Sequence, residues 1–271
     1  MIAETDTLSL APGVALRDGQ LADAVRGDSW PLNGSGAFVL CRMGLPVGQI
    51  VRELTNAFSL PLETARGDVL RFAWHLNSLA LVNVERQGSI VRRLADWILL
   101  AARLAPAGAV PVALARRRAL DTRSVPRAVS SGLVATLSRV AAIAAVSTVV
   151  AVQFSAVGGA PGLVVPLALG IATGVGLGLH EAAHVAALRG VPSALVTRGR
   201  RTYVLHAAVS PSRRSMVALA GPLAVATLGV ALVLGGTALG APSITIAGCP
   251  LAAHALALTI VGGDGRIACG L

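Results

Sequence analysis

The chain of 271 residues lacks lysine altogether and is poor in charged and aromatic side chains. All 23 basic residues are arginine, charged residues make up 13% and aromatic residues 3%. A soluble globular domain carries about 25% charged residues, so an ordinary soluble protein is excluded for the chain as a whole. The three cysteines form no CxxC pair, and this odd count argues against a disulfide framework or a thiolate zinc site.

Small and aliphatic residues take up the remaining share. The hydrophobic fraction is 54% and the mean hydropathy is +0.72, and small residues let membrane helices approach one another closely. A net charge of +10 would suit nucleic acid, but the later arginines fall between apolar runs. That pattern follows the rule that arginine favours the cytoplasmic side of a membrane. We therefore expect the lipid bilayer as a partner and no nucleic acid.

Residues 1–92 predict a cytoplasmic α+β domain. The N-terminus reads MIAETDTLSLAPG, which lacks the positive and apolar regions of a signal peptide. Two strands are predicted within residues 14–25, around a turn at Asp18 and Gly19. Apolar side chains then recur at helical spacing in three segments, and a last strand is predicted after them: residues 35–43, 47–58, 62–79 and then 81–85.

Residues 93–128 are predicted to link this domain to the membrane half. The stretch 94–120 is apolar but contains Arg103, Pro106 and Pro111, and arginines flank it at both ends. Positive flanks on both sides argue against a single crossing. We expect an interfacial helix or hairpin that lies on the membrane.

Residues 129–271 predict an all-α polytopic membrane domain. Four apolar runs are each long enough to span a bilayer: 133–157, 163–188, 215–239 and 242–262. The connections at 158–162 and 240–243 are uncharged, whereas the connection 189–214 holds six arginines. Four crossings with this charge pattern place both termini in the cytoplasm. We expect an integral protein of the bacterial plasma membrane.

Only two acidic residues follow Asp121, and one of them stands between two histidines. His180, Glu181 and His184 form the pattern H-E-x-x-H. Histidines four residues apart share one face of a helix and can bind one Zn²⁺, beside a glutamate that serves as general base. Such a motif arises by chance on soluble helices. Here it lies inside an apolar run, where ionisable groups are costly and mark functional sites.

A third metal ligand is predicted at Asp264. A third histidine spaced as in HExxHxxGxxH is excluded, because Gly190 stands in its place, and no acidic residue lies between Glu181 and Asp264. The predicted topology puts Asp264 at the same cytoplasmic depth as His180 and His184. The alternative for Asp264 is a plain Asp-Gly turn.

Three motifs follow one another over residues 165–271: HEAAHVAALRGVP, VSPSRRSMVALAGPLA and GGDGR. In this order they resemble the site-2 protease family of intramembrane zinc metalloproteases. The resemblance implies a Zn²⁺ cofactor held by His180, His184 and Asp264, with Glu181 as the catalytic base.

The same resemblance implies that residues 196–208 form a hairpin that dips into the membrane. The chain departs from the family at Val225, where an asparagine is common. Gly221, Pro222 and His254 are candidates for orienting the ligands or positioning substrate. For His254 the alternatives are a core residue whose polar atoms are satisfied and a substitute for the missing asparagine.

Two further segments lie within residues 10–90: SWPLNGSGAFVLCRM and VGQIVRELTNAFSLPLETARGDVLRFAWHLNSLALV. They resemble the PqqD-like domain, a small winged-helix module also called a RiPP recognition element. The resemblance implies that the domain binds the leader segment of a ribosomally made precursor peptide as an added strand. The alternative is a winged-helix domain of another use, such as DNA binding.

Together the two halves predict a zinc metalloendopeptidase that removes a leader during maturation of a ribosomally synthesised modified peptide. Daptide-type products, which are apolar and helical, are one candidate class. Two alternatives remain: cleavage of a membrane-tethered regulator, and a non-catalytic membrane scaffold that binds peptides. Glu181 argues against the scaffold, which has no need of a buried carboxylate beside two imidazoles.

Overall fold

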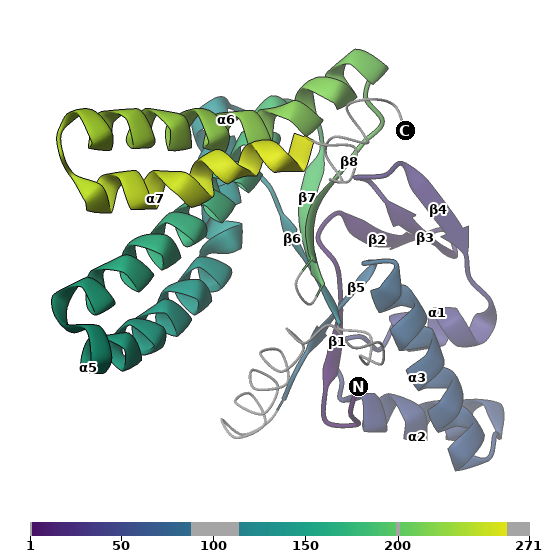
Figure 1. Cartoon of the computed structure of the whole chain (residues 1–271). Coiled ribbons are helices and arrows are strands. Elements are labelled where there is room, and N and C mark those ends of the chain that lie inside the picture. The colour runs from purple at the N-terminus through teal and green to yellow at the C-terminus, as the bar shows by residue number, and fades with distance from the viewer. Residues whose placement is uncertain (1, 88–113, 199–200, 259–271) are drawn as a thin grey trace. The chain divides into compact units, whose positions relative to one another are not determined.

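The computed structural model describes residues 2–87, 114–198 and 201–258 (Figure 1). It divides the chain into two compact units. The first comprises Met1–Ala119 and Ala194–Ala207, and the second comprises Leu120–Ser193 and Ala208–Leu271. The chain therefore passes between the units three times.

The first unit contains a small α/β domain with antiparallel strands. Strands β1 (Thr7–Leu10) and β5 (Val82–Glu85) pair with each other, and β2 (Val14–Arg17), β3 (Gln20–Asp23) and β4 (Asp28–Pro31) form a meander in that order. The helices are α1 (Gly34–Leu40), α2 (Val47–Phe58) and α3 (Leu62–Ser78). The three predicted helices, the two strands around Asp18 and Gly19 and the last strand are thereby confirmed. The winged-helix arrangement stays a prediction.

Local chemistry explains where these elements turn and begin. Asp18 and Gly19 both have positive φ, 47° and 72°, as the tightest hairpin turns require. The Asn33 side chain accepts a hydrogen bond of 2.8 Å from the Gly36 N–H and so caps α1. Helices α2 and α3 bury their apolar faces against each other and the strands, with Ile50 and Val69 at most 1% exposed.

A third sheet of the first unit combines strands that are distant in the sequence. Its order is β6 (Ala115–Ala119), β7 (Ser193–Arg198) and β8 (Arg201–His206). The strand pair β7–β8 corresponds to the hairpin predicted at residues 196–208. Residues 115–119, which the sequence assigned to an interfacial segment, instead form a strand antiparallel to β7. Residues 94–113 of that segment lie outside the described residues.

Two asparagine side chains hold β6 against the α/β domain. The Asn77 carboxamide accepts a hydrogen bond from the Ala115 N–H and donates one to the Ala115 carbonyl, both 2.8 Å long. Asn83 makes the same pair of bonds with Arg117, at 2.8 and 2.9 Å. The Arg117 side chain in turn forms two bonds of 2.7 and 2.8 Å to the Asp23 carboxylate. Both side chains of this ion pair are fully buried.

The second unit is helical. It consists of α5 (Val125–Ala187), α6 (Pro211–Ala238), α7 (Pro242–Ala252) and the short 3₁₀ helix η1 (Ala253–Leu258). Helix α5 doubles back on itself, as Figure 1 shows, and its two arms meet where Gly132 packs against Ala182 and Gly174 against Val140. These glycines allow the two arms to approach closely.

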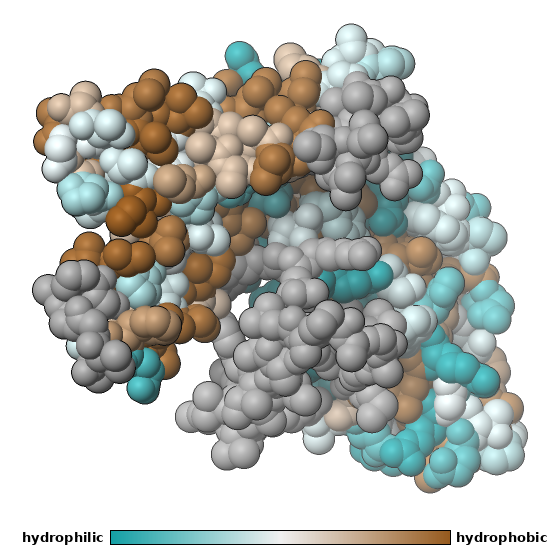
Figure 2. All heavy atoms as spheres, viewed as in Figure 1, coloured by the Kyte–Doolittle hydropathy of each residue, from teal (hydrophilic) through white to brown (hydrophobic). Residues whose placement is uncertain are grey.

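Two described helices are long and apolar enough to cross a membrane, Leu163–Ala187 and Pro211–Ala238. A third span results if the pair Val125–Leu137 and Val140–Ser155, bent by 48°, counts as one. Apolar side chains predominate on the coloured surface of these helices in Figure 2. The second unit therefore has the character of a membrane domain.

The predicted count of four spans is not settled by the described residues. The fourth predicted span, 242–262, coincides in part with the apolar helix Pro242–Leu258, which is shorter than the other spans. Residues 259–262 lie outside the described part. The count of four and the cytoplasmic orientation of the termini stay predictions.

Candidate functional site

The three residues of the HEAAH motif lie near the end of the apolar helix Leu163–Ala187. Glu181 is 6% exposed and His184 8%, and His180 is half-buried. Ionisable side chains are costly in an apolar environment without water. Such a cluster on an apolar helix is therefore a candidate functional site.

The two imidazoles converge as the spacing predicts. Nε2 of His180 lies 3.0 Å from Nε2 of His184, and the ring centroids are 4.6 Å apart. Two nitrogens that each lie about 2.0–2.1 Å from a tetrahedral zinc are roughly 3.3–3.4 Å apart. A shift of a few tenths of an ångström therefore brings this pair to the separation that a shared zinc requires.

The tautomer of His184 follows from its second ring nitrogen. Nδ1 lies 2.6 Å from the carbonyl oxygen of Val217 on α6. A carbonyl only accepts, so Nδ1 donates its proton and Nε2 of the neutral ring keeps a lone pair. Metal-binding histidines are oriented by such a bond to a carbonyl or carboxylate. Sequence reasoning missed Val217, because every residue carries a carbonyl and no motif marks this one.

Two of the predicted positioning candidates lie on the same helix. A Cβ added at Gly221 would come within 2.5 Å of Nε2 of His184, so the imidazole packs directly on the backbone of α6. Pro222 lies in the helix interior, where its missing N–H cannot bond the carbonyl four residues earlier. The structure thus places Gly221 against a predicted ligand, and the sequence signal was its place in the AGPLA motif.

The remaining predicted residues divide between described and undescribed parts of the chain. The ring of His254, in η1, has its centroid 5.7 Å from that of His180. Asp264, the predicted third ligand, lies outside the described residues. Within residues 2–87, 114–198 and 201–258, no three His, Cys, Asp or Glu side chains are grouped closely enough to hold a metal. The donor set on α5 fits two of the ligands of a zinc site.

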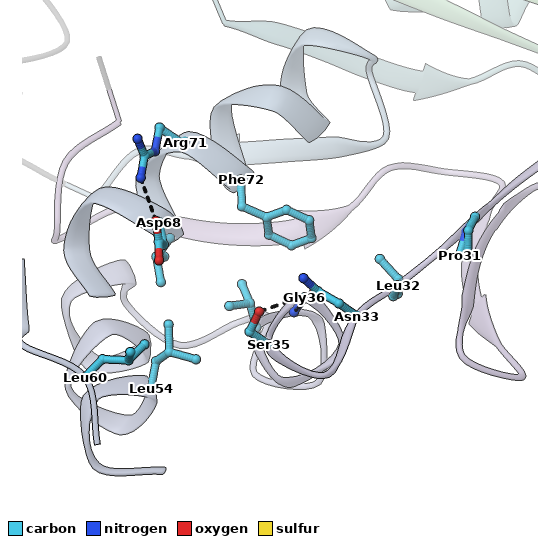
Figure 3. Close-up of a pocket in the computed structure, with 12 residues that line it drawn as sticks. Pro31, Leu32, Asn33, Ser35, Gly36, Leu54, Leu60, Asp68, Arg71 and Phe72 are labelled. Carbon is cyan, nitrogen blue, oxygen red and sulfur yellow. Dashed lines mark hydrogen bonds and ion pairs between the residues drawn. The ribbon is translucent and has the colours of Figure 1, made fainter. Parts of the chain in front are cut away.

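A second candidate site lies in the first unit. Strand β4 pairs with β3 and forms the edge of the described sheet. Its last residue, Pro31, also lines a hollow of about 620 Å³. The hollow combines apolar side chains, Val69 among them, with a few polar groups. Figure 3 shows Leu32, Leu54, Leu60 and Phe72 beside Asn33 and the ion pair of Asp68 with Arg71. An exposed strand edge that leads into an apolar hollow suits an extended peptide.

Comparison with known proteins bears on this second site. Residues 19–82, 64 of the 271, match the family model described as coenzyme PQQ synthesis protein D (PqqD). No curated protein and no solved structure matches the chain. The resemblance read from residues 10–90 is confirmed for this segment, and nothing in these comparisons tests the resemblance to site-2 proteases. The chain therefore contains a PqqD-like domain at residues 19–82, of a kind that binds peptides in the biosynthesis of ribosomally made natural products.

Proposed function

We propose that the chain is an intramembrane zinc metalloendopeptidase that binds a precursor peptide through its PqqD-like domain and removes the leader. The observation that carries the peptidase part is the geometry of the two histidines. Their Nε2 atoms converge to 3.0 Å, and the Val217 carbonyl holds the tautomer that a metal requires on His184. Glu181 stands between them in the sequence and is nearly buried.

Each residue then has a definite role. His180 and His184 hold the ion, with Asp264 as the expected third ligand, and α6 orients His184. A bound Zn²⁺ lowers the pKa of water and polarises the scissile carbonyl. Glu181 accepts the proton of the attacking water and passes it to the leaving amine. The apolar helices around the motif exclude bulk water, which strengthens these electrostatic interactions.

Peptide recognition is assigned to the edge of β4 and the hollow beside it. A leader segment that adds to β4 as a strand gains main-chain hydrogen bonds, which give affinity, and its alternate side chains enter the hollow, which gives specificity. The PqqD-like domain favours peptide maturation over cleavage of a membrane-tethered regulator, because it belongs to peptide biosynthesis. An apolar, helical product of the daptide type would suit a site within membrane helices.

The experiment compares the wild type with Glu181→Gln, both purified in detergent. The substrates are candidate leader–core peptides, each with and without its N-terminal leader, and a fluorescein-labelled Ala/Leu peptide of about 20 residues, the length of one span. We expect both proteins to bind one zinc, measured by elemental analysis, and only the wild type to cleave. The substitution keeps the size of the side chain and removes the base.

Three results would contradict the proposal or a part of it. Absence of bound zinc from both proteins would leave the HEAAH motif without a metal and favour a membrane-anchored peptide-binding protein. Equal cleavage by Glu181→Gln would assign the activity to another residue or to a contaminating protease. Cleavage of the leaderless peptides at the same rate as the full precursors would remove the role of the PqqD-like domain.

A further inference from the structure

His254 is the histidine of the α7–η1 segment, and its own backbone sets its tautomer. Nδ1 lies 3.0 Å from the carbonyl oxygen of Pro250, four residues earlier. A carbonyl only accepts, so Nδ1 donates and Nε2 of the neutral ring is a hydrogen-bond acceptor. Within the described residues, the structure records no partner for this Nε2.

The ring lies over the face of α5 that carries the HEAAH motif. Gly176 and His180 are four residues apart and therefore share that face. A Cβ added at Gly176 would lie 3.2 Å from Cε1 of His254, and the rings of His254 and His180 have centroids 5.7 Å apart at a tilt of 48°. Gly176 thus leaves room for an imidazole next to the two converging histidines.

Two apolar side chains lie beside His254 at Gly176. They belong to Leu251 and Val225, which are 2% and 0% exposed. His254 itself is only partly buried. A polar acceptor that stays accessible among apolar side chains, beside a candidate catalytic centre, is placed to meet a ligand.

Cleavage of a peptide within a membrane is favoured by a hydrogen-bond acceptor of this kind. A helix must unwind locally to expose its scissile carbonyl, and unwinding frees backbone N–H groups that find no water in the apolar region. Each unsatisfied polar group there costs free energy. A fixed acceptor next to the site lowers the free energy of the unwound peptide.

We propose that His254 binds the substrate of the HEAAH site, with its Nε2 accepting a hydrogen bond from a backbone N–H of the unwound peptide. The inference rests on the proposed peptidase function. It assigns His254 to the substrate and not to the metal.

The test uses the full chain in detergent and the fluorescein-labelled Ala/Leu peptide. His254→Phe keeps a ring of similar size and removes the acceptor, and His254→Asn restores a shorter one. The control is Leu256→Ala, in the same 3₁₀ helix, where the side chain is 68% exposed. Dissociation constants are measured by fluorescence anisotropy on proteins that also carry Glu181→Gln, so that no cleavage occurs.

We expect His254→Phe to raise the dissociation constant about fivefold, the size of one lost hydrogen bond. In the cleaving protein it raises KM by the same factor and leaves kcat unchanged, because a contact made equally with substrate and transition state affects binding alone. Zinc content and melting temperature stay at wild-type values, His254→Asn recovers part of the affinity, and Leu256→Ala behaves as the wild type.

Three outcomes would overturn the inference. Loss of zinc from His254→Phe would make the residue a metal ligand. Unchanged peptide affinity and KM in His254→Phe would make His254 a packing residue. A loss of affinity in His254→Phe and His254→Asn that is accompanied by an equal loss of thermal stability would lead to the same conclusion. If the wild type fails to cleave but His254→Phe still weakens peptide binding, the peptidase proposal fails and the binding role of His254 stands.

Discussion

At the scale of single residues, two positions on α6 support the candidate site. Val217 and Gly221 are four residues apart and so lie on one face. The first accepts the proton of His184 Nδ1, and the second leaves space for the same ring. One helix face therefore sets both the tautomer and the position of a predicted zinc ligand.

Gly221→Ala is expected to weaken zinc binding. The added methyl group would meet the imidazole at 2.5 Å from Nε2 and push the ring off its bond to Val217. Loss of such supporting contacts costs roughly 10–100-fold in metal affinity. Competition with a fluorescent chelator measures it.

The matched control is Gly235→Ala, on the same helix, where an added Cβ meets nothing within 4 Å. This variant should bind zinc as the wild type does and gain slightly in helix stability. Equal zinc affinities for the two variants would show that the ring does not depend on Gly221.

The histidine pair was predictable from sequence, and its support only in part. A spacing of four residues puts two side chains on one helix face whatever surrounds them, so the convergence of His180 and His184 is confirmed. The two supporting partners come from elsewhere in the chain. The glycine, Gly221, was marked by its place in the AGPLA motif, whereas the backbone carbonyl 33 residues downstream of His184 leaves no residue-type signal.

At the scale of elements, amphipathic helices were predicted better than strands. Helices α2 and α3 bury one apolar stripe each, and such stripes can be read from spacing alone. Strand β6 could not be predicted, because Ala-Arg-Arg-Arg-Ala has no strand-like composition. Its partner β7 lies almost 80 residues downstream, and Arg117 is compatible with the interior only because Asp23 is there.

The ion pair of Asp23 and Arg117 makes the first unit sensitive to acid. Burial alone would raise the pKa of Asp23. The hydrogen bonds from Arg117 and from the N–H groups of Val25 and Arg26, with the charge of Arg117, outweigh burial and hold the pKa below its ordinary value. A lowered pKa contributes stability that is fully present above the unfolded value of about 3.9 and is lost as the pH falls through the folded value.

Arg117→Met is expected to destabilise the first unit by about 3–5 kcal/mol at neutral pH, since it leaves a buried carboxylate without its partner. Denaturant unfolding followed by tryptophan fluorescence measures the change. Acidification below about pH 4 should cost this variant less stability than it costs the wild type, because Asp23 no longer gains from the guanidinium.

Arg123→Met serves as the control. Its partner Asp121 also has a lowered pKa, about 2, held there by hydrogen bonds from Arg123. However, the Arg123 side chain is 77% exposed, and exposed ion pairs add little to stability. A loss as large as that of Arg117→Met would show that burial is not what makes the inner pair important.

At the scale of the whole molecule, one topological statement holds whether the chain has two, three or four spans. The hairpin β7–β8 follows one span, Leu163–Ala187, and precedes the next, Pro211–Ala238. The hairpin and the turn at Gly240 must then lie on opposite sides of the membrane. The arginines around the hairpin predict that it lies on the cytoplasmic side.

Cysteine labelling tests this arrangement. In a background where Cys41, Cys249 and Cys269 are replaced by alanine, Gly240→Cys should react with a membrane-impermeant maleimide in intact cells. Tyr203→Cys, in β8, where the side chain is exposed, should react only after the membrane is permeabilised. Labelling of Tyr203→Cys from outside would reverse the orientation, and equal labelling of both positions would remove one of the two spans.

The hydrogen bonds of Asn77 and Asn83 to β6 limit how this protein can be recombined with others. A recognition domain that ended near residue 87 could be exchanged between enzymes by a single crossover. Here a transplanted first segment would leave the carboxamides of Asn77 and Asn83 and the carboxylate of Asp23 without their partners. Each buried group left unmatched costs about 1–3 kcal/mol, and the charge more. A working chimera must therefore take three separate segments from the same protein: the N-terminal segment, the β6 strand and the hairpin between two membrane helices. Because the last two lie within or beside the membrane half of the sequence, we expect the two units to be exchanged only together.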